Sequence, residues 1–247
     1  MIAIAVLASS PAFAGHYAPA AGEEGSTAIW KEDPAIIGWA TGWTNYNLGS
    51  GPYLDYTDPD LALGSVQTGA YDVVNLGRNG DLTLTFDTPI RDVPGYDFAV
   101  FENSFSDNYL ELAYCEVSSD GEYFVRFDND SLTTALTESY VDPTDVDGLA
   151  GKYLQGYGTP FDLAQLSDPQ LDLQNIAYVR LVDVLGDGSN FDSSGDPIYD
   201  PYQDWLSNGF DLEAIAVIPE PQSLALLLAG PAFILLDKVR RRCFRRK

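Results

Sequence analysis

The sequence predicts an all-β protein that folds as a single β-sandwich of the jelly-roll type. Short runs of alternating apolar and polar residues recur along the chain between turns rich in Gly, Pro and Asp, a pattern typical of sandwiches and barrels. Between residues 25 and 218 no helical periodicity stands out, apart from one turn near Leu163–Leu166. Apolar residues occupy 45% of the 247 positions, which is enough to fill the core of one domain.

Six segments carry the expected strands. Leu82–Phe86 alternates with a period of two and is bounded by turn-forming residues on both sides. Glu111–Ser118 alternates in the same way and places Cys115 on its apolar face, so we expect this cysteine to be a small core residue. In chain order the expected strands are Leu82–Phe86, Asp97–Phe101, Glu111–Ser118, Tyr123–Phe127, Ile176–Val184 and Asp211–Ile218.

The charge of the chain is divided unequally between its body and its C-terminus. Seven of the 13 Lys and Arg residues lie in the last ten positions, and residues 1–218 hold 35 acidic residues against 6 basic ones, a net charge of −29. Such a body is repelled by nucleic acid and by anionic lipid, so neither is an expected partner. His16 is the one histidine of the chain, which excludes a Ser–His–Asp triad, a Cys–His pair and a multi-histidine metal site.

Both ends of the chain have features of targeting segments. Met1–Ala14 is an apolar run that ends in a small-x-small pattern, as in a secretory signal peptide cleaved before Gly15. At the other end, Pro219, Glu220 and Pro221 precede the apolar stretch Ser223–Leu236. A basic block that includes Arg240, Arg241 and Arg242 follows, as in a cytoplasmic stop-transfer flank. We therefore divide the chain into a signal peptide (1–14), a β-sandwich surface domain (15–218) and a C-terminal sorting segment with a hydrophobic helix (219–247).

The order of these C-terminal parts resembles the PEP-CTERM sorting signal of exopolysaccharide-producing Gram-negative bacteria. The resemblance covers roughly the last thirty residues. It implies export by the Sec machinery, a transient stay in the inner membrane through residues 223–238, and processing by an exosortase near Pro219–Pro221. The body would then reach the cell surface or the exopolysaccharide of the extracellular matrix.

Parts of the body also resemble known families. The hairpin Val117–Phe124 is similar to one found in discoidin-like, galactose-binding-type jelly rolls. A longer set of segments resembles bacterial cell-surface proteins that carry the same sorting tail, which implies a surface location and no specific activity. These segments are residues 97–105, 111–121, 148–153, 156–163 and 186–202.

The densest group of candidate ligands is a set of acidic and amide side chains interleaved with glycines. Hard oxygen donors on flexible loops suit Ca²⁺, which takes six to eight oxygens without strict geometry, so we expect a structural Ca²⁺ here. The alternative is a set of solvated acidic turns, and an acidic surface also suits a salty habitat. The residues are Asp183, Asp187, Asn190, Asp192, Asp196 and Asp200, with Asp142, Asp145 and Asp147 as a second candidate set.

We expect an exported structural or adhesive protein of the cell surface or matrix, and not an enzyme. One alternative is a lectin-like carbohydrate-binding module, because aromatic rings beside Asp and Asn acceptors suit sugars. Its candidate residues are Trp39, Trp43, Tyr202 and Trp205. The other is a secreted glycan-processing enzyme, which would need two carboxylates such as Glu102 and Glu111 across a cleft.

Overall fold

The computed structural model describes residues 16–218 except 53, 68, 70, 135–139 and 202–208. Two six-stranded sheets dominate it, and every strand pair that the structure assigns in these residues is antiparallel. The first sheet has the order β1 (Ile29–Trp30), β12 (Tyr157–Phe161), β6 (Phe98–Glu102), β16 (Asp211–Val217) and β2 (Gly38–Trp39), with β4 (Val74–Asn75) also paired to β16. The second has the order β11 (Leu149–Ala150), β7 (Ala113–Ser118), β13 (Ile176–Asp183), β5 (Asp81–Ile90) and β3 (Gly42–Asn47), with β8 (Val125–Arg126) also paired to β7.

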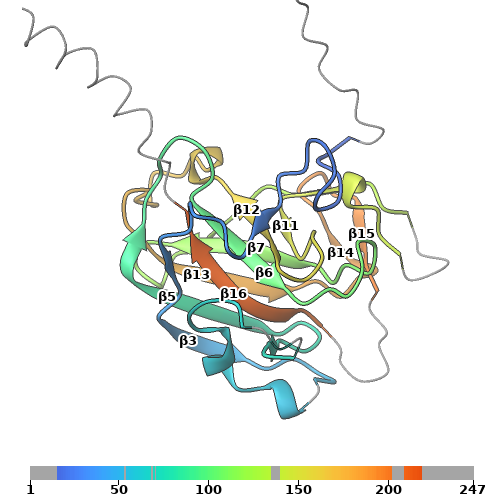
Figure 1. Ribbon diagram of the computed structural model, residues 1–247, viewed down its shortest axis with the longest axis horizontal. Coiled ribbons are helices and arrows are strands. Elements are labelled where there is room, and N and C mark those ends of the chain that lie inside the picture. The colour runs from blue at the N-terminus through green and yellow to red at the C-terminus, as the bar shows by residue number, and fades with distance from the viewer. Residues whose placement is uncertain are drawn as a thin grey trace, which may run out of the picture.

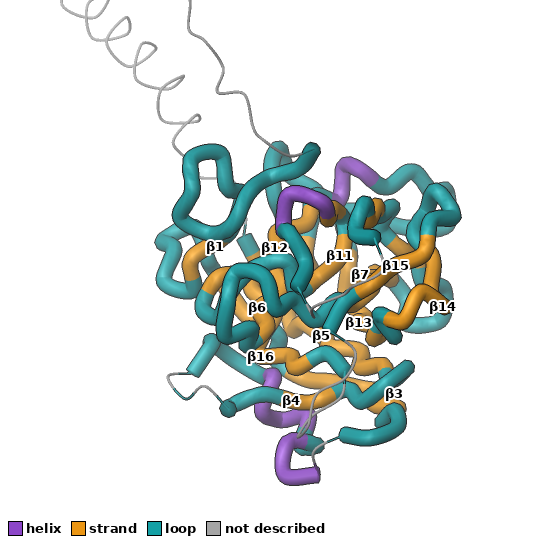
Figure 2. The backbone as a smooth tube through the Cα atoms, turned by 90° about the vertical axis from the view of Figure 1, so that its right-hand side faces the viewer, coloured by secondary structure: helices purple, strands orange, loops and turns teal. Residues whose placement is uncertain are grey.

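Smaller elements surround the two sheets (Figures 1 and 2). The chain passes repeatedly from one sheet to the other. Along the chain, β5, β7 and β13 lie in the second sheet while β6, β12 and β16 lie in the first. This alternation agrees with a jelly-roll-like sandwich. Two ribbons complete the strands: β9 (Asp130–Ser131) with β10 (Val146–Asp147), and β14 (Asp187–Phe191) with β15 (Pro197–Tyr199). The helices in the described residues are short 3-10 turns at Leu54–Tyr56 (η1), Pro59–Ala62 (η2), Pro143–Asp145 (η3) and Leu163–Gln165 (η4).

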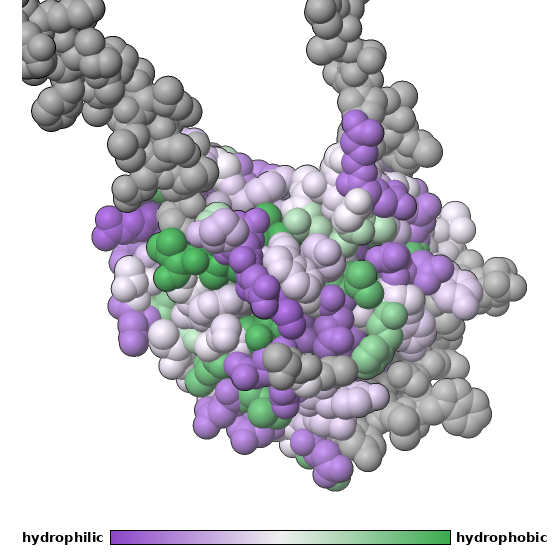
Figure 3. Space-filling model, in the orientation of Figure 1, coloured by the Kyte–Doolittle hydropathy of each residue, from purple (hydrophilic) through white to green (hydrophobic). Residues whose placement is uncertain are grey.

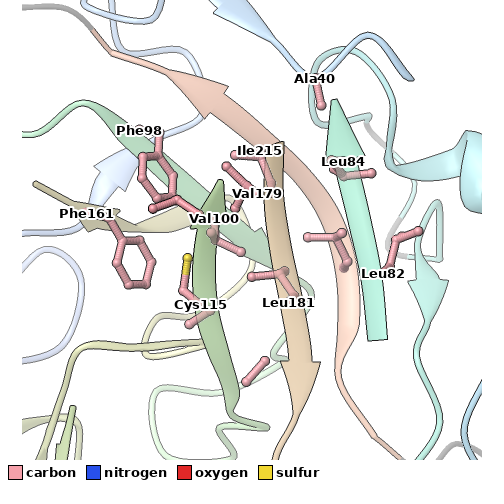
Figure 4. Packing of buried hydrophobic residues seen from close by; sticks show 14 of the residues in the cluster. Ala40, Leu82, Leu84, Phe98, Val100, Cys115, Phe161, Val179, Leu181 and Ile215 are labelled. Atoms are coloured by element: carbon pink, nitrogen blue, oxygen red, sulfur yellow. The ribbon is translucent and has the colours of Figure 1, made fainter. Parts of the chain in front are cut away.

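The apolar core lies between the inner faces of the two sheets (Figure 4). Phe98 and Val100 of β6 meet side chains of β7 and β13, and Leu181 of β13 is fully buried. Cys115 on β7 is also fully buried, which confirms the prediction that it is a small core residue. On the opposite face of β7, Glu116 forms ion pairs with Arg126 and Arg180, so both faces of this strand are covered.

The all-β prediction is confirmed, and all six expected segments contain strands. The expected strand Tyr123–Phe127 shortens to the two residues of β8, and the expected turn near Leu163 is η4. Strand β12 was not predicted, because Gly158 and Pro160 interrupt the alternating pattern of its residues. Gly158 is required there because a Cβ would lie 2.8 Å from the Phe101 ring on the neighbouring strand.

Two features concern membranes and exposed surface. Within the described part of the chain, no helix is long and apolar enough to cross a membrane. The expected signal peptide Met1–Ala14 and the sorting segment 219–247 lie outside the described residues. On the face shown in Figure 3, hydrophobic patches are separated by hydrophilic residues.

Truncation of a core side chain tests this packing. We expect Leu181→Ala to lower the free energy of unfolding by about 2–5 kcal/mol, because it leaves a cavity between the sheets. Leu54→Ala is the matched control, since Leu54 is 74% exposed and its truncation should change that free energy by less than about 0.5 kcal/mol. Urea unfolding followed by circular dichroism measures both, and equal losses in the two variants would contradict the assigned core.

Candidate functional site

Five acidic side chains gather at one end of the sandwich, on the side where β14 and β15 lie (Figure 1). Four belong to strand ends of the two sheets or lie near them: β6 ends at Glu102, β16 begins at Asp211, β13 ends at Asp183, and Glu111 lies two residues before β7. The fifth, Asp200, directly follows β15. We call these five residues the acidic cluster.

Backbone and amide donors hold most of the acidic cluster in place. Asp183 accepts hydrogen bonds from the backbone N–H groups of Phe210 and Asn79, at 2.8 and 2.9 Å. Asp200 accepts from the N–H of Leu112 at 3.0 Å. Each of these bonds joins segments far apart in the sequence, so the carboxylates fasten loops to strands.

Two further members, Asp211 and Glu102, are held by an amide donor and a backbone donor. Asp211 accepts from Nδ2 of Asn75 at 2.6 Å, and Glu102 accepts from the N–H of Ser104 at 2.9 Å. Leu212 pairs with Glu102 in the sheet, which keeps Asp211 and Glu102 close.

Burial and mutual repulsion make these carboxyl groups hard to ionise. Burial, followed by the charge of Asp211, raises the pKa of both Glu102 and Glu111 well above its usual value. Burial also raises the pKa of Asp183 to about 7 and that of Asp200 well above the usual range. Arg78 offsets this in part, because its charge lowers the pKa of Asp183 and Asp200 while its guanidinium lies 3.9 Å from Asp187.

A small cavity opens between members of the acidic cluster. Glu111, Asp183 and Asp200 line it together with Arg78 and Gly209, and its volume is about 10 Å³. This is close to the least space that one water molecule needs, so the cavity suits a single ion or water and not a sugar ring. The carboxylates around it are hard oxygen donors, the ligand type that Ca²⁺ prefers.

A tighter group of three carboxylates lies elsewhere. In the described residues, Asp92, Asp97 and Asp162 are the one set whose oxygens all lie within 4.8 Å of one another. Both oxygens of Asp97 already accept backbone N–H groups, from Val93 and Leu163, at 2.9 and 2.7 Å. Its pKa is nevertheless raised to about 6, chiefly by burial. Asp97 therefore has a structural role, because its carboxylate links the backbone at Val93 to the backbone at Leu163.

The structure divides the six predicted Ca²⁺ ligands between separate positions. Asp183 and Asp200 line the same cavity, and Asp187 lies beside it, paired with Arg78. Asn190 is used differently, since its Oδ1 accepts the N–H of Leu185 at 2.7 Å within the β13–β14 connection.

The other two predicted ligands, Asp192 and Asp196, belong to a different turn. Oδ1 of Asp192 accepts the N–H groups of Ser194 and Asp196, both at 2.9 Å, and its Oδ2 accepts that of Ser131. These hydrogen bonds lower the pKa of Asp192.

The second predicted set is also spread out. Asp142 caps η3 by accepting from the backbone N–H of Thr144 at 2.9 Å. Asp145 lies within η3, and burial raises its pKa. Asp147 is exposed on β10 and lines a different cavity, together with Lys152.

The predicted sugar-binding aromatics have separate surroundings. Trp39 is half-buried and packs against Phe101, with ring centroids 5.6 Å apart. Trp43 is 42% exposed and donates from Nε1 to Asp60 at 2.8 Å. Tyr202 and Trp205 lie outside the described residues.

Sequence reasoning missed the acidic cluster as a unit. Glu102 and Glu111 were named as a candidate catalytic pair and not among the predicted Ca²⁺ ligands, and Asp211 was named as the first residue of an expected strand. The sequence feature that could have predicted this cluster is the position of acidic residues at the ends of apolar runs. That feature becomes specific only when the strand order is known.

Comparisons with known proteins add little. No family model matches the chain, and no curated protein matches it. Among solved structures, it is similar to the F5/8 type C domain of a Bacteroides fragilis protein. The match has 13% sequence identity and a TM-score of 0.35, and it covers 78% of this chain and 95% of that one. That TM-score is too low to transfer fold or function from that domain.

Proposed function

We propose that this chain is an exported, non-catalytic module of the bacterial cell surface or matrix, whose sandwich binds a divalent cation, Ca²⁺, at the acidic cluster. The observation that carries the cation proposal is the cavity of about 10 Å³ lined by Glu111, Asp183 and Asp200. A buried cation there would compensate carboxylates that otherwise resist ionisation. Export and sorting are supported by the sequence of the two chain ends, Met1–Ala14 and residues 219–247.

The donor set favours Ca²⁺ over other metal ions. The ionisable ligands near the cavity are carboxylates, with no histidine or cysteine among the described residues that line it, so ions that prefer nitrogen or sulfur are disfavoured. The carboxylates belong to three separate segments, and Asp183 and Asp200 keep their backbone hydrogen bonds. Ca²⁺ accepts such irregular sets with carbonyl and water oxygens added, whereas Mg²⁺ demands near-octahedral geometry.

Ca²⁺ binding should be linked to pH. Because the folded pKa of Asp183 is raised, the native state holds more protons than the unfolded state between about pH 4 and pH 7. Stability without metal is therefore greatest at low pH and falls as the pH rises through 7. In EDTA, we expect the melting temperature of the purified full-length chain to fall between about pH 5 and pH 8.

Added Ca²⁺ should reverse this fall. At about 10 mM Ca²⁺ and a Kd of ~1 mM, typical of extracellular modules, stability at pH 8 should rise by about 1.4 kcal/mol. Differential scanning fluorimetry at both pH values measures the shift. An unchanged melting temperature at pH 8 would contradict the cation proposal.

Three Asp→Asn variants locate the cation. Asp200→Asn should abolish the Ca²⁺ shift and keep the fold, because the amide retains the shape and the acceptor for Leu112. Asp192→Asn is the matched control: it should weaken its turn and retain the shift, since that carboxylate is occupied by backbone donors. Loss of the shift in Asp97→Asn instead would move the site to the Asp92, Asp97 and Asp162 group.

The sorting proposal is tested by cell fractionation. Deleting residues 219–247 should remove the protein from the cell surface and release it in soluble form, because both the recognition motif and the apolar stretch are lost. Replacing Pro219 and Pro221 with Ala keeps the apolar stretch, so that variant should accumulate in the membrane fraction. Normal surface delivery of the truncated chain would refute this proposal.

Carbohydrate binding is the second candidate function, and an aromatic surface favours it. Tyr71 and Phe105 are each 60% exposed, with ring centroids 5.9 Å apart, and Tyr56 stacks on Tyr71 at 6.0 Å. Exposed rings in a row can stack on the apolar faces of sugars.

If this surface binds glycans, Tyr71→Ala should weaken binding to a glycan array by about tenfold, or ~1.4 kcal/mol. Tyr123→Ala is the control, since Tyr123 is an exposed tyrosine on the β7–β8 turn. Equal binding by both variants would remove this candidate.

A further inference from the structure

A second cavity shares no lining residue with the cavity at the acidic cluster. The buried side chain of Lys152 forms part of its wall. The volume of this second cavity is about 400 Å³, within the usual range of small-molecule sites. Segments of the N-terminal region, β10, β12 and η4 form its walls, and Lys152 follows β11 on its inner side. The sequence analysis named the segment 148–153 only as part of a family resemblance.

Lys152 is 3% exposed, and its ammonium group lacks a hydrogen-bond acceptor among the described residues. Neither an ion pair nor a hydrogen bond to its Nζ is found in the described residues, although its backbone N–H donates to Oγ1 of Thr159 at 3.1 Å. The Tyr17 and Tyr153 rings lie 5.8 and 5.7 Å from Nζ, which gives the charge weak aromatic contacts. Because Lys152 lines the cavity, its three N–H donors can be paired there by water or by a ligand.

The acids near Lys152 leave this charge unpaired. Asp147 faces the cavity and raises the pKa of Lys152, but it forms no ion pair with it within the described chain. Burial outweighs this effect and lowers the pKa of Lys152 to about 8. Tyr17 donates its hydroxyl to Asp130, so the nearest phenol is committed elsewhere.

The remaining walls suit an organic molecule. Pro160 and Phe161 supply apolar surface, and Tyr96, which is 37% exposed, lies at the cavity with the exposed Asp147. Thr27 and Tyr153 share a hydrogen bond of 2.7 Å between their hydroxyl oxygens, which fixes the wall beside Lys152. A cation, aromatic rings and apolar surface thus line the same cavity.

We propose that this cavity binds a small carboxylate-bearing molecule, with its carboxylate accepting hydrogen bonds from the Lys152 ammonium group. A carboxylate supplies both the acceptors and the charge that the ammonium lacks. The net charge of −29 on residues 1–218 repels polyanions, so a monoanion such as a single uronic acid residue fits better than a polyuronate. This site is independent of the Ca²⁺ proposal.

The test uses the full-length chain with ¹³C-labelled lysine and NMR detection of the Lys152 Cε signal. The probes are acetate, benzoate and glucuronate, with glucose as the ring without a carboxylate. Binding should shift this signal and raise the pKa of Lys152, because an anion stabilises the ammonium form. Glucose should do neither, and a larger effect of glucuronate than of acetate would assign the rest of the cavity to a sugar ring.

The pH profile separates binding from a merely structural role. Affinity for the carboxylate probes should fall as the pH rises through about 8, where Lys152 loses its proton. The other titratable groups that face Lys152 are His16, Tyr17, Tyr96, Asp147 and Tyr153. The pKa of each of these tyrosines is raised, so they stay neutral in this range.

Two variants complete the experiment. Lys152→Met keeps the length and apolar stem of the side chain, removes the buried charge, and should reduce affinity at least tenfold without loss of folding. Lys31→Met, at the other lysine of residues 1–218, should bind as the wild type does. The proposal is overturned if no carboxylate probe moves the Lys152 signal, if glucose binds equally well, or if Lys152→Met retains full affinity. Stronger binding of polyuronate than of glucuronate would overturn the monoanion assignment.

Discussion

The contact between the two sheets determines where the strand-end carboxylates of the acidic cluster lie. Once β6 and β16 face β7 and β13 across an apolar core, the ends of these strands meet at one edge of the sandwich. Glu102, Asp211 and Asp183 occupy those ends. The acidic cluster is therefore a consequence of strand order, and a different pairing of the same strands would scatter its carboxylates over the surface.

Two aspartates of this fold, Asp192 and Asp200, have pKa values shifted in opposite directions, and their surroundings determine the direction. Asp192 is 7% exposed and accepts three backbone N–H groups, and its pKa is lowered. Asp200 accepts one such group in a buried position beside other acids, and its pKa is raised. The first aspartate stabilises the fold as an anion by itself, whereas the second needs a proton or a cation. Lys152 presents the converse case, a buried cation that lacks an anion.

Much of the fold could be predicted from local patterns. Alternation over Leu82–Phe86 and Glu111–Ser118 identified β5 and β7, including the inward face of Cys115. Strand β12 was not predicted, because its sequence contains Gly158. The glycine is required by the close approach of the Phe101 ring on the neighbouring strand, which local sequence does not show. The six predicted Ca²⁺ ligands were close in sequence, but the structure brings Asp183 and Asp200 to one cavity and assigns Asn190 and Asp192 to loop closure.

The sequence by itself determined the all-β class, the position of the main strands and the division between an acidic body and a basic C-terminal end. These follow from periodicity and composition, which are properties of neighbouring residues. Only the tertiary structure decided which acids share a cavity and that Lys152 lies buried with no ion-pair partner among the described residues. The physical reason is that pKa and burial depend on groups brought together from distant segments, such as Glu111 with Asp183 or Tyr17 with Lys152.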